Sequence, residues 1–316
     1  MYYIGIDLGG TNIAAGIVDE NHRIVVKGSV PTLPDREPEL IIKDMGGLCL
    51  SLLKKAGLTI RDVARAGIVS PGSVDPENGY IIYSNNIPFR NFPITEVLKK
   101  YLPVGNIYLE NDANAAALGE AVAGAARGTE ISVMITLGTG VGGGVIIGGK
   151  IYSGFNHAGA ELGHTVIEYN GRPCTCGRRG CFEAYSSATA LRKMTAEKLS
   201  VTKDTLMWEL CGGDARNVDA KIAFAAMKKG DRAGKEVVDA YISYLACGIT
   251  NMINIFQPDV LSIGGGICNE KEYLLGPLTE IVEREQYTRH NKIKTKIRIA
   301  ELGNDAGIIG ASALSS

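Results

Sequence analysis

The chain has 316 residues, 45% of them hydrophobic, and its 33 basic and 34 acidic side chains leave a formal net charge of −1. This balance excludes intrinsic disorder, which requires low hydrophobicity and high net charge. It also argues against a nucleic-acid-binding surface, which needs concentrated basic charge. The length predicts two domains. Glycine occurs 40 times, well above average usage, so we expect many tight turns or close approaches of the backbone to a ligand.

The first third of the chain alternates β-type runs with turn-like residues and then adds strand–helix units. The expected elements are strands at 3–6, 13–18 and 24–26, a helix at 37–55, a strand at 64–69, a helix at 94–100, a strand at 106–109 and a helix that ends near 123. Residues 70–93 are rich in Pro, Gly and Asn. This order predicts a three-stranded meander followed by strand–helix units.

A similar order begins again at residue 131. It comprises strands at 131–137, 145–147 and 151–152, a long helix with apolar residues at Val238, Tyr241, Leu245, Ile249, Met252 and Phe256, a strand at 260–263, and a last strand at 297–300 before a final helix. The 3.6-residue period of the long helix predicts one buried face. Two meanders of this kind predict two α/β domains of one design, and a cleft between them is the default ligand site.

We expect a soluble, cytoplasmic protein without membrane association. Residues 131–149 carry no charge, but seven of these 19 positions are Gly and only nine are apolar, which is poor material for a membrane-spanning helix. The chain opens directly on a strand and shows no signal peptide. Its seven cysteines are therefore expected in a reducing compartment.

Two glycine-rich loops follow strands. Gly138-Thr139-Gly140-Val141-Gly142-Gly143 formally fits the pattern GxGxxG. However, a strand follows it, whereas a dinucleotide fingerprint needs a helix, and no Lys-Ser/Thr ends it as in a Walker A loop. We interpret it as a hairpin whose backbone N–H groups and Thr139 hydroxyl bind phosphate oxygens. A second loop, Asp7-Leu8-Gly9-Gly10-Thr11-Asn12, supports this interpretation over that of an ordinary tight hairpin, because two facing hairpins could hold one polyphosphate.

Asp7 would lie beside that phosphate at the end of the first strand. A carboxylate there could hold Mg²⁺, which prefers oxygen ligands. The alternative is a turn aspartate that bonds its own backbone.

Asn111-Asp112 lies at a strand-to-helix elbow, where the side chain of Asp112 could accept a hydroxyl proton as a general base. Asn and Asp are also preferred N-cap residues, and the same dipeptide recurs at Asn304-Asp305. One of the two pairs could serve only as a cap.

Three cysteines fall within eight residues, and a histidine precedes them. His164, Cys174, Cys176 and Cys181 offer four ligands suited to tetrahedral Zn²⁺, and a site with four protein ligands would be closed and structural. A redox pair at Cys174 and Cys176, or unligated thiols, are the alternatives.

In this order the motifs are specific, and the chain resembles the ROK (repressor, open reading frame, kinase) family of sugar kinases over essentially its whole length. The motifs that carry the resemblance are the two glycine loops, 110–116 (Glu-Asn-Asp-Ala-Asn-Ala-Ala), 161–164 (Glu-Leu-Gly-His), and 174–183 (Cys-Thr-Cys-Gly-Arg-Arg-Gly-Cys-Phe-Glu). The likeness is greatest to the family's bacterial glucokinases. It implies an actin-like, hexokinase-type fold in which two RNase H-like α/β domains close on ATP and a hexose. We place the small domain at residues 1–112, with a C-terminal helix at about 303–316 packed against it, and the large domain with the zinc site at 113–302.

The resemblance also implies roles for individual residues, and the reaction would be transfer of the ATP γ-phosphate to the 6-hydroxyl of a hexose, with Asp112 as general base. The implied sugar ligands are Gly72, Asn86, Asn111, Asp112, Glu161, His164 and Glu183. The implied ATP and Mg²⁺ residues are Asp7, Gly9, Gly10, Thr11, Asn12, Gly138, Thr139, Gly140, Gly264, Gly265 and Gly266. The implied zinc ligands are His164, Cys174, Cys176 and Cys181. A homodimer or homotetramer is the assembly that the family implies.

Two departures leave the identity of the sugar open. Phe89 stands where the family's glucokinases usually have Trp, and Ser70-Pro71-Gly72-Ser73 differs from their usual Pro-Gly-Pro. The alternatives are a kinase for N-acetylmannosamine, fructose, allose or mannose, a non-catalytic sugar sensor, and a nicotinamide-dependent dehydrogenase. The family's repressors carry an additional N-terminal helix-turn-helix that this chain does not show, so we expect no DNA-binding role.

Overall fold

The computed structural model describes residues 1–84 and 87–315, and its contacts divide the chain into two compact units. Unit 1 contains Met1–Ser132, Gly144–Ala160 and Ala300–Ser316, and unit 2 contains Val133–Gly143 and Glu161–Ile299. The domain boundary expected after residue 112 follows the repeated order of strands and helices, and it stays a prediction.

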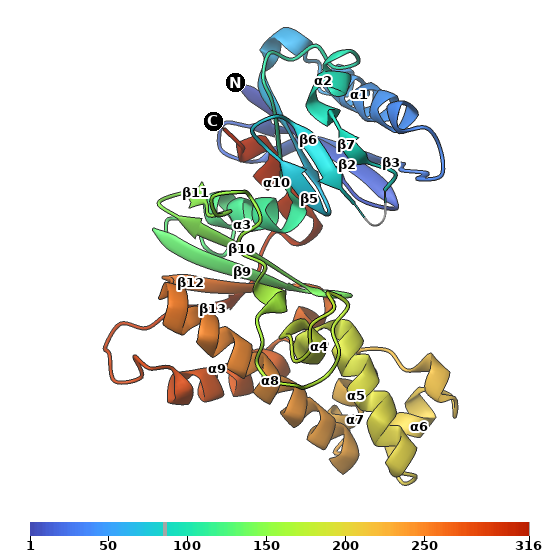
Figure 1. Ribbon diagram of the computed structural model, residues 1–316, viewed down its shortest axis with the longest axis vertical. Helices are drawn as coiled ribbons and strands as arrows, with labels where there is room; N and C mark the ends of the chain where they lie inside the picture. The colour runs from blue at the N-terminus through green and yellow to red at the C-terminus, as the bar shows by residue number, and fades with distance from the viewer. Residues whose placement is uncertain (85–86, 316) are drawn as a thin grey trace. The chain divides into compact units, whose positions relative to one another are not determined.

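A five-stranded sheet with the order β3-β2-β1-β4-β8 forms the centre of unit 1 (Figure 1). Its strands are β1 (Tyr2–Leu8), β2 (Asn12–Asp19), β3 (Ile24–Pro31), β4 (Val63–Ser70) and β8 (Ile107–Asn111). The first three pair antiparallel, which confirms the predicted meander, whereas β4 pairs in parallel with both β1 and β8. The carboxyl ends of β1, β4 and β8 therefore lie along one edge of the sheet.

Helices pack on both faces of this sheet. The apolar side chains of β1 share a core with those of α1 (Pro38–Lys55). On the other side, α10 (Ala306–Ala313) approaches so closely that a β-carbon at Gly67 would overlap the carbonyl oxygen of Ala311. The remaining helices of unit 1 are α2 (Ile94–Lys99) and α3 (Asp112–Ala123). The helices predicted at 37–55, at 94–100 and after residue 111 are thus confirmed.

A small three-stranded sheet, for which the sequence gives no strand pattern, occupies the stretch rich in Pro, Gly and Asn. Its order is β5-β6-β7, with β5 (Ser73–Asp75), β6 (Tyr80–Tyr83) and β7 (Arg90–Phe92). The strands are only three or four residues long, which is too short for an alternating pattern to emerge between turn residues.

A second five-stranded sheet has the order β11-β10-β9-β12-β13. Its strands are β9 (Ile131–Leu137), β10 (Val141–Ile147), β11 (Lys150–Ile151), β12 (Val260–Gly264) and β13 (Lys296–Ile299). The predicted strands of the second half are therefore confirmed, but β10 begins at Val141, within the stretch predicted as the glycine loop. The division between the units passes through β9 and β10.

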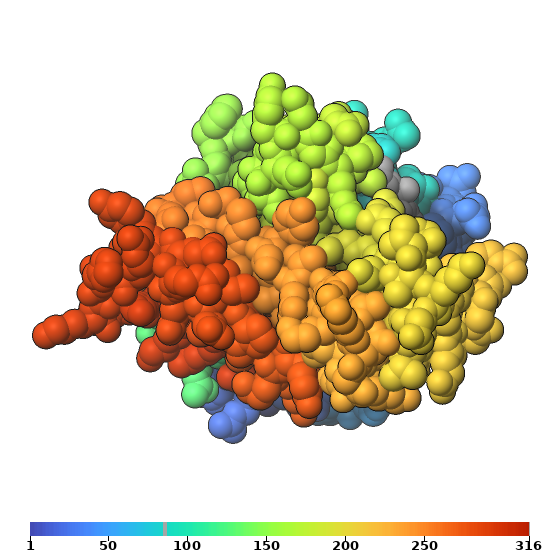
Figure 2. All heavy atoms as spheres, turned by 90° about the horizontal axis from the view of Figure 1, so that it is seen from below, coloured from blue at the N-terminus to red at the C-terminus, as the bar shows by residue number. Residues whose placement is uncertain are grey.

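Unit 2 is rich in helices, and the yellow and orange atoms in Figure 2 belong to its residues. The helices are α4 (Glu183–Ser186), α5 (Ala188–Val201), α6 (Leu206–Leu210), α7 (Ile222–Lys228), α8 (Arg232–Phe256) and α9 (Glu272–Glu285). The predicted apolar face of α8 is buried from Val238 to Met252, and Phe256 is half-buried at its end.

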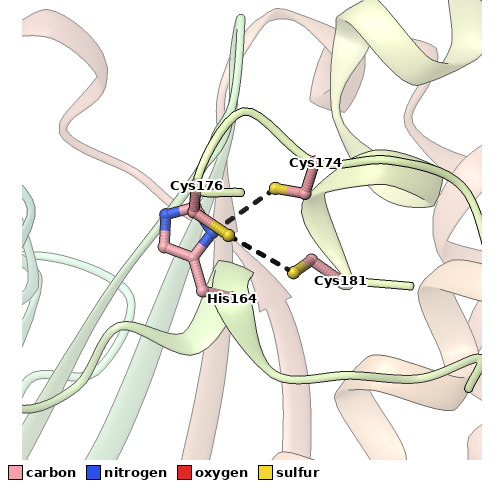
Figure 3. Close-up of side chains that lie close together, drawn as sticks. All are labelled: His164, Cys174, Cys176 and Cys181. Carbon is pink, nitrogen blue, oxygen red and sulfur yellow. Dashed lines mark hydrogen bonds between the residues drawn. The ribbon is translucent and has the colours of Figure 1, made fainter. Parts of the chain in front are cut away.

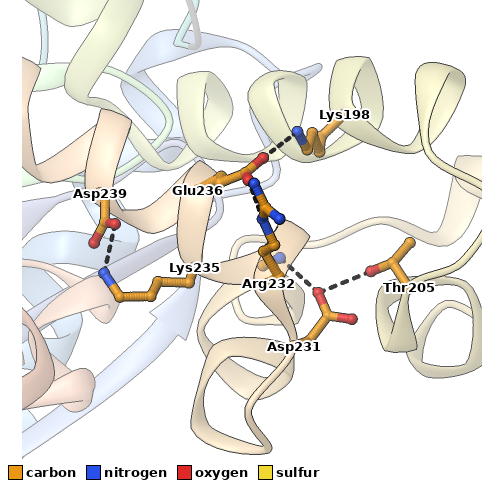
Figure 4. A network of polar contacts seen from close by, with 8 residues as sticks. Lys198, Thr205, Asp231, Arg232, Lys235, Glu236 and Asp239 are labelled. Carbon is orange, nitrogen blue, oxygen red and sulfur yellow. Dashed lines mark hydrogen bonds and ion pairs between the residues drawn. The ribbon is translucent and has the colours of Figure 1, made fainter.

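Polar contacts hold the first turns of α8 against α5 and α6 (Figure 4). The Asp231 carboxylate is the N-cap of α8, where it accepts a hydrogen bond from the Gly234 N–H at 2.6 Å, and it also accepts one from the Thr205 hydroxyl at 2.9 Å. Glu236 pairs with Lys198 of α5. Capping and cross-helix pairs of this kind fix the start of the longest helix in the unit.

Among the described residues, no helix combines the length and apolar character that crossing a bilayer requires.

Candidate active site

Polar side chains gather at the carboxyl edge of the unit 1 sheet. Asp7 on β1 is paired with Val69 on β4, and Val69 is in turn paired with Glu110 on β8. One residue further on, Asn111 is the last residue of β8. In open α/β sheets, ligands bind beyond the carboxyl ends of parallel strands. The register therefore brings three polar side chains to the edge of the sheet where chemistry is expected.

The two polar residues at the elbow after β8, Asn111 and Asp112, make different hydrogen bonds. Asn111 is the N-cap of α3, and its side-chain oxygen accepts hydrogen bonds from the N–H groups of Ala113 at 2.9 Å and Asn114 at 3.3 Å. Its side-chain nitrogen donates to the Gly72 carbonyl oxygen at 3.1 Å. Asp112 accepts the Ala113 N–H through Oδ1 at 2.9 Å. Asn111 is therefore the residue whose side chain caps α3, whereas Asp112 carries its carboxylate on the first residue of the helix.

The second Asn-Asp pair plays another role. Asp305 flanks α10 but makes no side-chain cap. Its carboxylate instead accepts two hydrogen bonds from the Lys27 ammonium, at 2.6 and 2.8 Å. The sequence could not show which Asn-Asp pair serves as a helix cap. In the structure, the first pair caps α3 through Asn111, and the second forms a partly exposed ion pair through Asp305.

The two aspartates of the edge influence each other. Burial, and to a lesser degree the charge of Asp112, raise the pKa of Asp7 from 3.8 to about 6. Burial also raises the pKa of Asp112, against the lowering effect of the N–H groups of Ala113 and of Asp112 itself. Two desolvated carboxyl groups near each other favour a proton or a cation between them. The pair could therefore hold a hard divalent cation while one member acts as a base.

The first glycine loop is held by a residue that the sequence did not reveal. The N–H of Gly9 donates to the Asn12 carbonyl oxygen at 3.0 Å. The buried Thr32 donates its hydroxyl to the Gly9 carbonyl oxygen at 2.7 Å and its N–H to that of Thr11 at 2.8 Å. The half-buried Gly10 and the exposed side chains of Thr11 and Asn12 form the tip of the loop. The hairpin is thus fixed at its base and accessible at its tip, as a phosphate-binding loop must be.

In unit 2, the other two predicted nucleotide segments lie together. The N–H of Gly138 donates to the Gly140 carbonyl oxygen at 3.0 Å, and the Gly138 carbonyl oxygen accepts the Ala188 N–H at 2.9 Å. Thr139 is exposed at the tip. Gly265 has φ of +101°, and a β-carbon there would overlap the carbonyl oxygen of Leu137. The loops at 138–140 and 264–266 therefore meet at the ends of β9 and β12, and only glycine permits the approach.

The four predicted metal ligands come together in unit 2 (Figure 3). Their ligand atoms all lie within 4.8 Å of one another. The Sγ atoms of Cys176 and Cys181 are 3.7 Å apart, and His164 Nδ1 lies 3.7 Å from Cys174 Sγ. Around a tetrahedral zinc with bonds of about 2.3 Å, neighbouring sulfur ligands lie about 3.8 Å apart. Donor types and spacing thus fit a closed zinc site, and binding through Nδ1 would leave His164 Nε2 for another partner.

The remaining predicted sugar ligands divide between the units. Gly72 has φ of +99° and lies in unit 1, where its carbonyl oxygen accepts the Asn111 hydrogen bond. Glu161 is exposed in unit 2, three residues before His164. The carboxylate of Glu183, also in unit 2, is hydrogen-bonded within the protein. Asn86 lies outside the described residues.

Glu110 is a supporting residue to which no role had been assigned. Its buried carboxylate accepts the Asn111 N–H at 2.8 Å and the Asn114 side-chain N–H at 3.0 Å, and so it fixes the elbow from behind. The spacing of Glu110 and Asn114, four residues apart across the start of a helix, was a usable signal. Thr32 gave none, because it is distant in sequence from the loop it supports.

Comparisons with known proteins agree with this arrangement. The family model described as "ROK family" matches residues 3–316. A glucokinase of Thermotoga maritima is 40% identical over 313 residues, covering 98% of this chain and 96% of the relative.

Solved structures are similar over the same length. A ROK family glucokinase from Streptomyces griseus, in complex with glucose and AMPPNP, has a TM-score of 0.80 and 31% identity, and the match covers 100% of this chain and 99% of that one. A ROK hexokinase from Thermus thermophilus has a TM-score of 0.84 and 33% identity, with coverage of 99% and 97%. The fold is therefore the actin-like fold of hexokinase-type sugar kinases, as expected. The chain belongs to the ROK family.

Proposed function

We propose that this protein is an ATP- and Mg²⁺-dependent hexose kinase that phosphorylates glucose at its 6-hydroxyl, with Asp112 as the general base. The observation that carries the proposal is the Asp112 carboxylate. It lies at the carboxyl edge of the sheet, and burial raises its pKa. The N-cap of α3 is the neighbouring Asn111. Full-length similarity to glucokinases supports the same activity.

Residues of the candidate site can be assigned to proton transfer, to charge neutralisation and to nucleotide binding. Asp112 accepts the proton of the sugar's 6-hydroxyl as that oxygen bonds to the γ-phosphorus of ATP, and the bond from phosphorus to the bridging oxygen breaks to release ADP. Asp7 would hold the Mg²⁺ that neutralises the phosphates. Phosphoryl transfer needs positioning and charge neutralisation more than covalent help. Backbone N–H groups of the loops at 9–12, 138–140 and 264–266 would bind the nucleotide.

The sugar ligands in this proposal are Gly72, Asn86, Asn111, Asp112, Glu161, His164 and Glu183. Sugar hydroxyls both donate and accept, so carboxylates, amides and imidazole suit them. His164 and the three cysteines would hold a structural zinc ion, which fixes the loop that carries them. A cytoplasmic homodimer or homotetramer completes the proposal.

The decisive experiment is Asp112→Asn, assayed by coupled ADP release together with calorimetric glucose binding. Loss of a general base costs about 10²–10⁴-fold in turnover, and glucose binding should be largely retained. Asp305→Asn is the matched control, because it changes the same residue type in the same dipeptide on the partly exposed Lys27 pair. Near-normal turnover of Asp112→Asn would refute the assignment.

The identity of the sugar needs its own test. Phe89, which replaces the usual Trp, is fully buried, and its ring packs at 4.8 Å from that of Phe92. A panel of glucose, mannose, fructose, allose and N-acetylmannosamine in the same assay would rank these substrates by kcat/KM. Sugar binding without any ADP release would instead favour a non-catalytic sensor.

A further inference from the structure

The carboxylate of Glu183 links two elements that are far apart in sequence. Through Oε2 it accepts the N–H of Val141, the residue that follows the Gly138–Gly140 loop, at 3.0 Å. Through Oε1 it accepts the Thr175 hydroxyl at 3.2 Å and the Cys174 thiol at 3.6 Å. One side chain thus holds the glycine hairpin with one oxygen and the cysteine segment with the other.

Close packing supports the same link. A β-carbon at Gly140 would overlap Oε2 of Glu183, so a larger residue at position 140 would displace the carboxylate from its present position. On the other flank, a β-carbon at Gly163, the neighbour of His164, would overlap the carbonyl oxygen of Val141. The hairpin therefore contacts the metal-binding segment at both of that segment's ends, beside its first ligand and just beyond its last.

The cysteine segment has little regular structure of its own. Only two isolated β-bridges, Val166 to Cys181 and Pro173 to Arg179, are found in it outside the named strands. A segment of this kind takes much of its order from the metal it binds. A metal-bound Cys174 is a thiolate and donates no hydrogen bond, so in the filled site the Thr175 hydroxyl would hold Oε1 of Glu183. Without the metal, Thr175 would no longer be held in place to do so.

We propose that Glu183, in addition to its place among the sugar ligands, positions the nucleotide loop and couples the metal site to it, so that a filled site tightens nucleotide binding. This inference rests on the proposed function, because it takes the loop at 138–140 to bind ATP and the four-ligand site to bind zinc. When Glu183 is fixed, the Val141 N–H keeps its acceptor and the hairpin is already ordered before ATP arrives. When Glu183 is released, ATP must order the hairpin itself, and affinity falls. Linkage requires that nucleotide tighten zinc binding by the same factor.

The test measures binding of AMPPNP with Mg²⁺ by calorimetry, on full-length protein loaded with zinc and on protein stripped by a chelator that is then dialysed away. We expect the dissociation constant to rise about five- to tenfold on stripping, which is within the range of ordinary coupling between sites. Hydrogen exchange of the Val141 amide should accelerate in parallel.

Variants separate coupling from general stability. Thr175→Val removes one contact of Glu183 without touching the metal or the hairpin, and its zinc-loaded form should bind AMPPNP nearly as weakly as stripped wild type. Thr175→Ser keeps the hydroxyl and should restore the difference between loaded and stripped protein. Glu183→Ala should abolish that difference, whereas Glu183→Gln, which keeps a carbonyl oxygen for the Val141 N–H, should retain part of it. A merely structural role would lower the melting temperature and leave the ratio of the two dissociation constants unchanged.

The outcomes are distinguishable. Equal AMPPNP affinity with and without zinc, or a normal ratio in Thr175→Val, would overturn the coupling and leave the kinase proposal intact. If neither the zinc-loaded nor the stripped protein bound AMPPNP, the proposed kinase function would be refuted, and the coupling that rests on it would be refuted as well. If the purified protein took up no zinc, the metal assignment would fail, and the coupling with it.

Discussion

Replacing Asp7 by Asn should stabilise the protein at neutral pH. Asp7 is buried at the end of β1 beside a second carboxyl group, and its pKa rises from 3.8 to about 6. In the folded state the group therefore keeps its proton between about pH 4 and pH 6, where the unfolded chain has already released it. Because the folded state binds more protons in this window, stability falls as pH rises through it. Above pH 6 the whole penalty is present.

The magnitude follows from the shift. About two pH units, at about 1.4 kcal/mol each, correspond to about 3 kcal/mol of free energy of unfolding. Asparagine has nearly the same shape and carries no charge. The free energy of unfolding of Asp7→Asn should thus exceed that of wild type by about 3 kcal/mol at pH 8, and the two should be nearly equal at pH 4.

The assay must report on unit 1. The chain has a single tryptophan, Trp208, which lies in unit 2, so its fluorescence would follow the wrong unit. Hydrogen exchange of the β1 and β4 amides, measured in magnesium-free buffer, gives the free energy of opening of unit 1. The exposed Asp35→Asn serves as the control and should change nothing. No gain at pH 8, or a gain of equal size at pH 4, would refute the reasoning.

Three further predictions concern packing, a buried carboxylate and the metal. Gly46→Ala should destabilise unit 1 by about 1–3 kcal/mol, because its β-carbon would lie 2.6 Å from Cβ of Tyr101. Its neighbour Gly47→Ala, which meets nothing within 4 Å, should stabilise the same helix by about 0.5–1 kcal/mol, so urea titration should separate the pair by sign. Glu120→Gln should lower the free energy of unfolding by about 1–3 kcal/mol, since the fully buried carboxylate accepts three backbone N–H groups. An unchanged melting temperature would contradict this. Elemental analysis should find one zinc per chain, and Cys176→Ala should lower both zinc content and melting temperature.

Elements with a strong local pattern could be predicted from the sequence. The periodic apolar face of α8 and the two meanders emerged because their buried residues repeat at fixed spacing. The four metal ligands were recognisable because ligand types and loop spacing are local features. The small sheet of β5, β6 and β7 was missed because its strands are too short to show a pattern.

Hydrogen bonds between residues far apart in the sequence could not be predicted from local patterns. Nothing in the sequence near Gly9 indicates that Thr32 will hold it, and nothing near Val141 indicates Glu183. Both contacts depend on how strands and loops are placed after folding. Conversely, Asn111 and Asp112 could be named as a pair, but which of them caps the helix required the hydrogen bonds themselves.

The close fit of α10 against β1 and β4 bears on the order in which the protein is made. The strand β1 leaves the ribosome well before α10, the helix that covers one face of its sheet, because most of unit 2 lies between them in the sequence. Until then, the glycine-lined face of this sheet has no partner. The intervening residues of unit 2 can fold in the meantime, since domains fold as units during synthesis. The sheet of unit 1 would thus be completed only after most of unit 2 has been synthesised, and until then the face that α10 covers would be exposed.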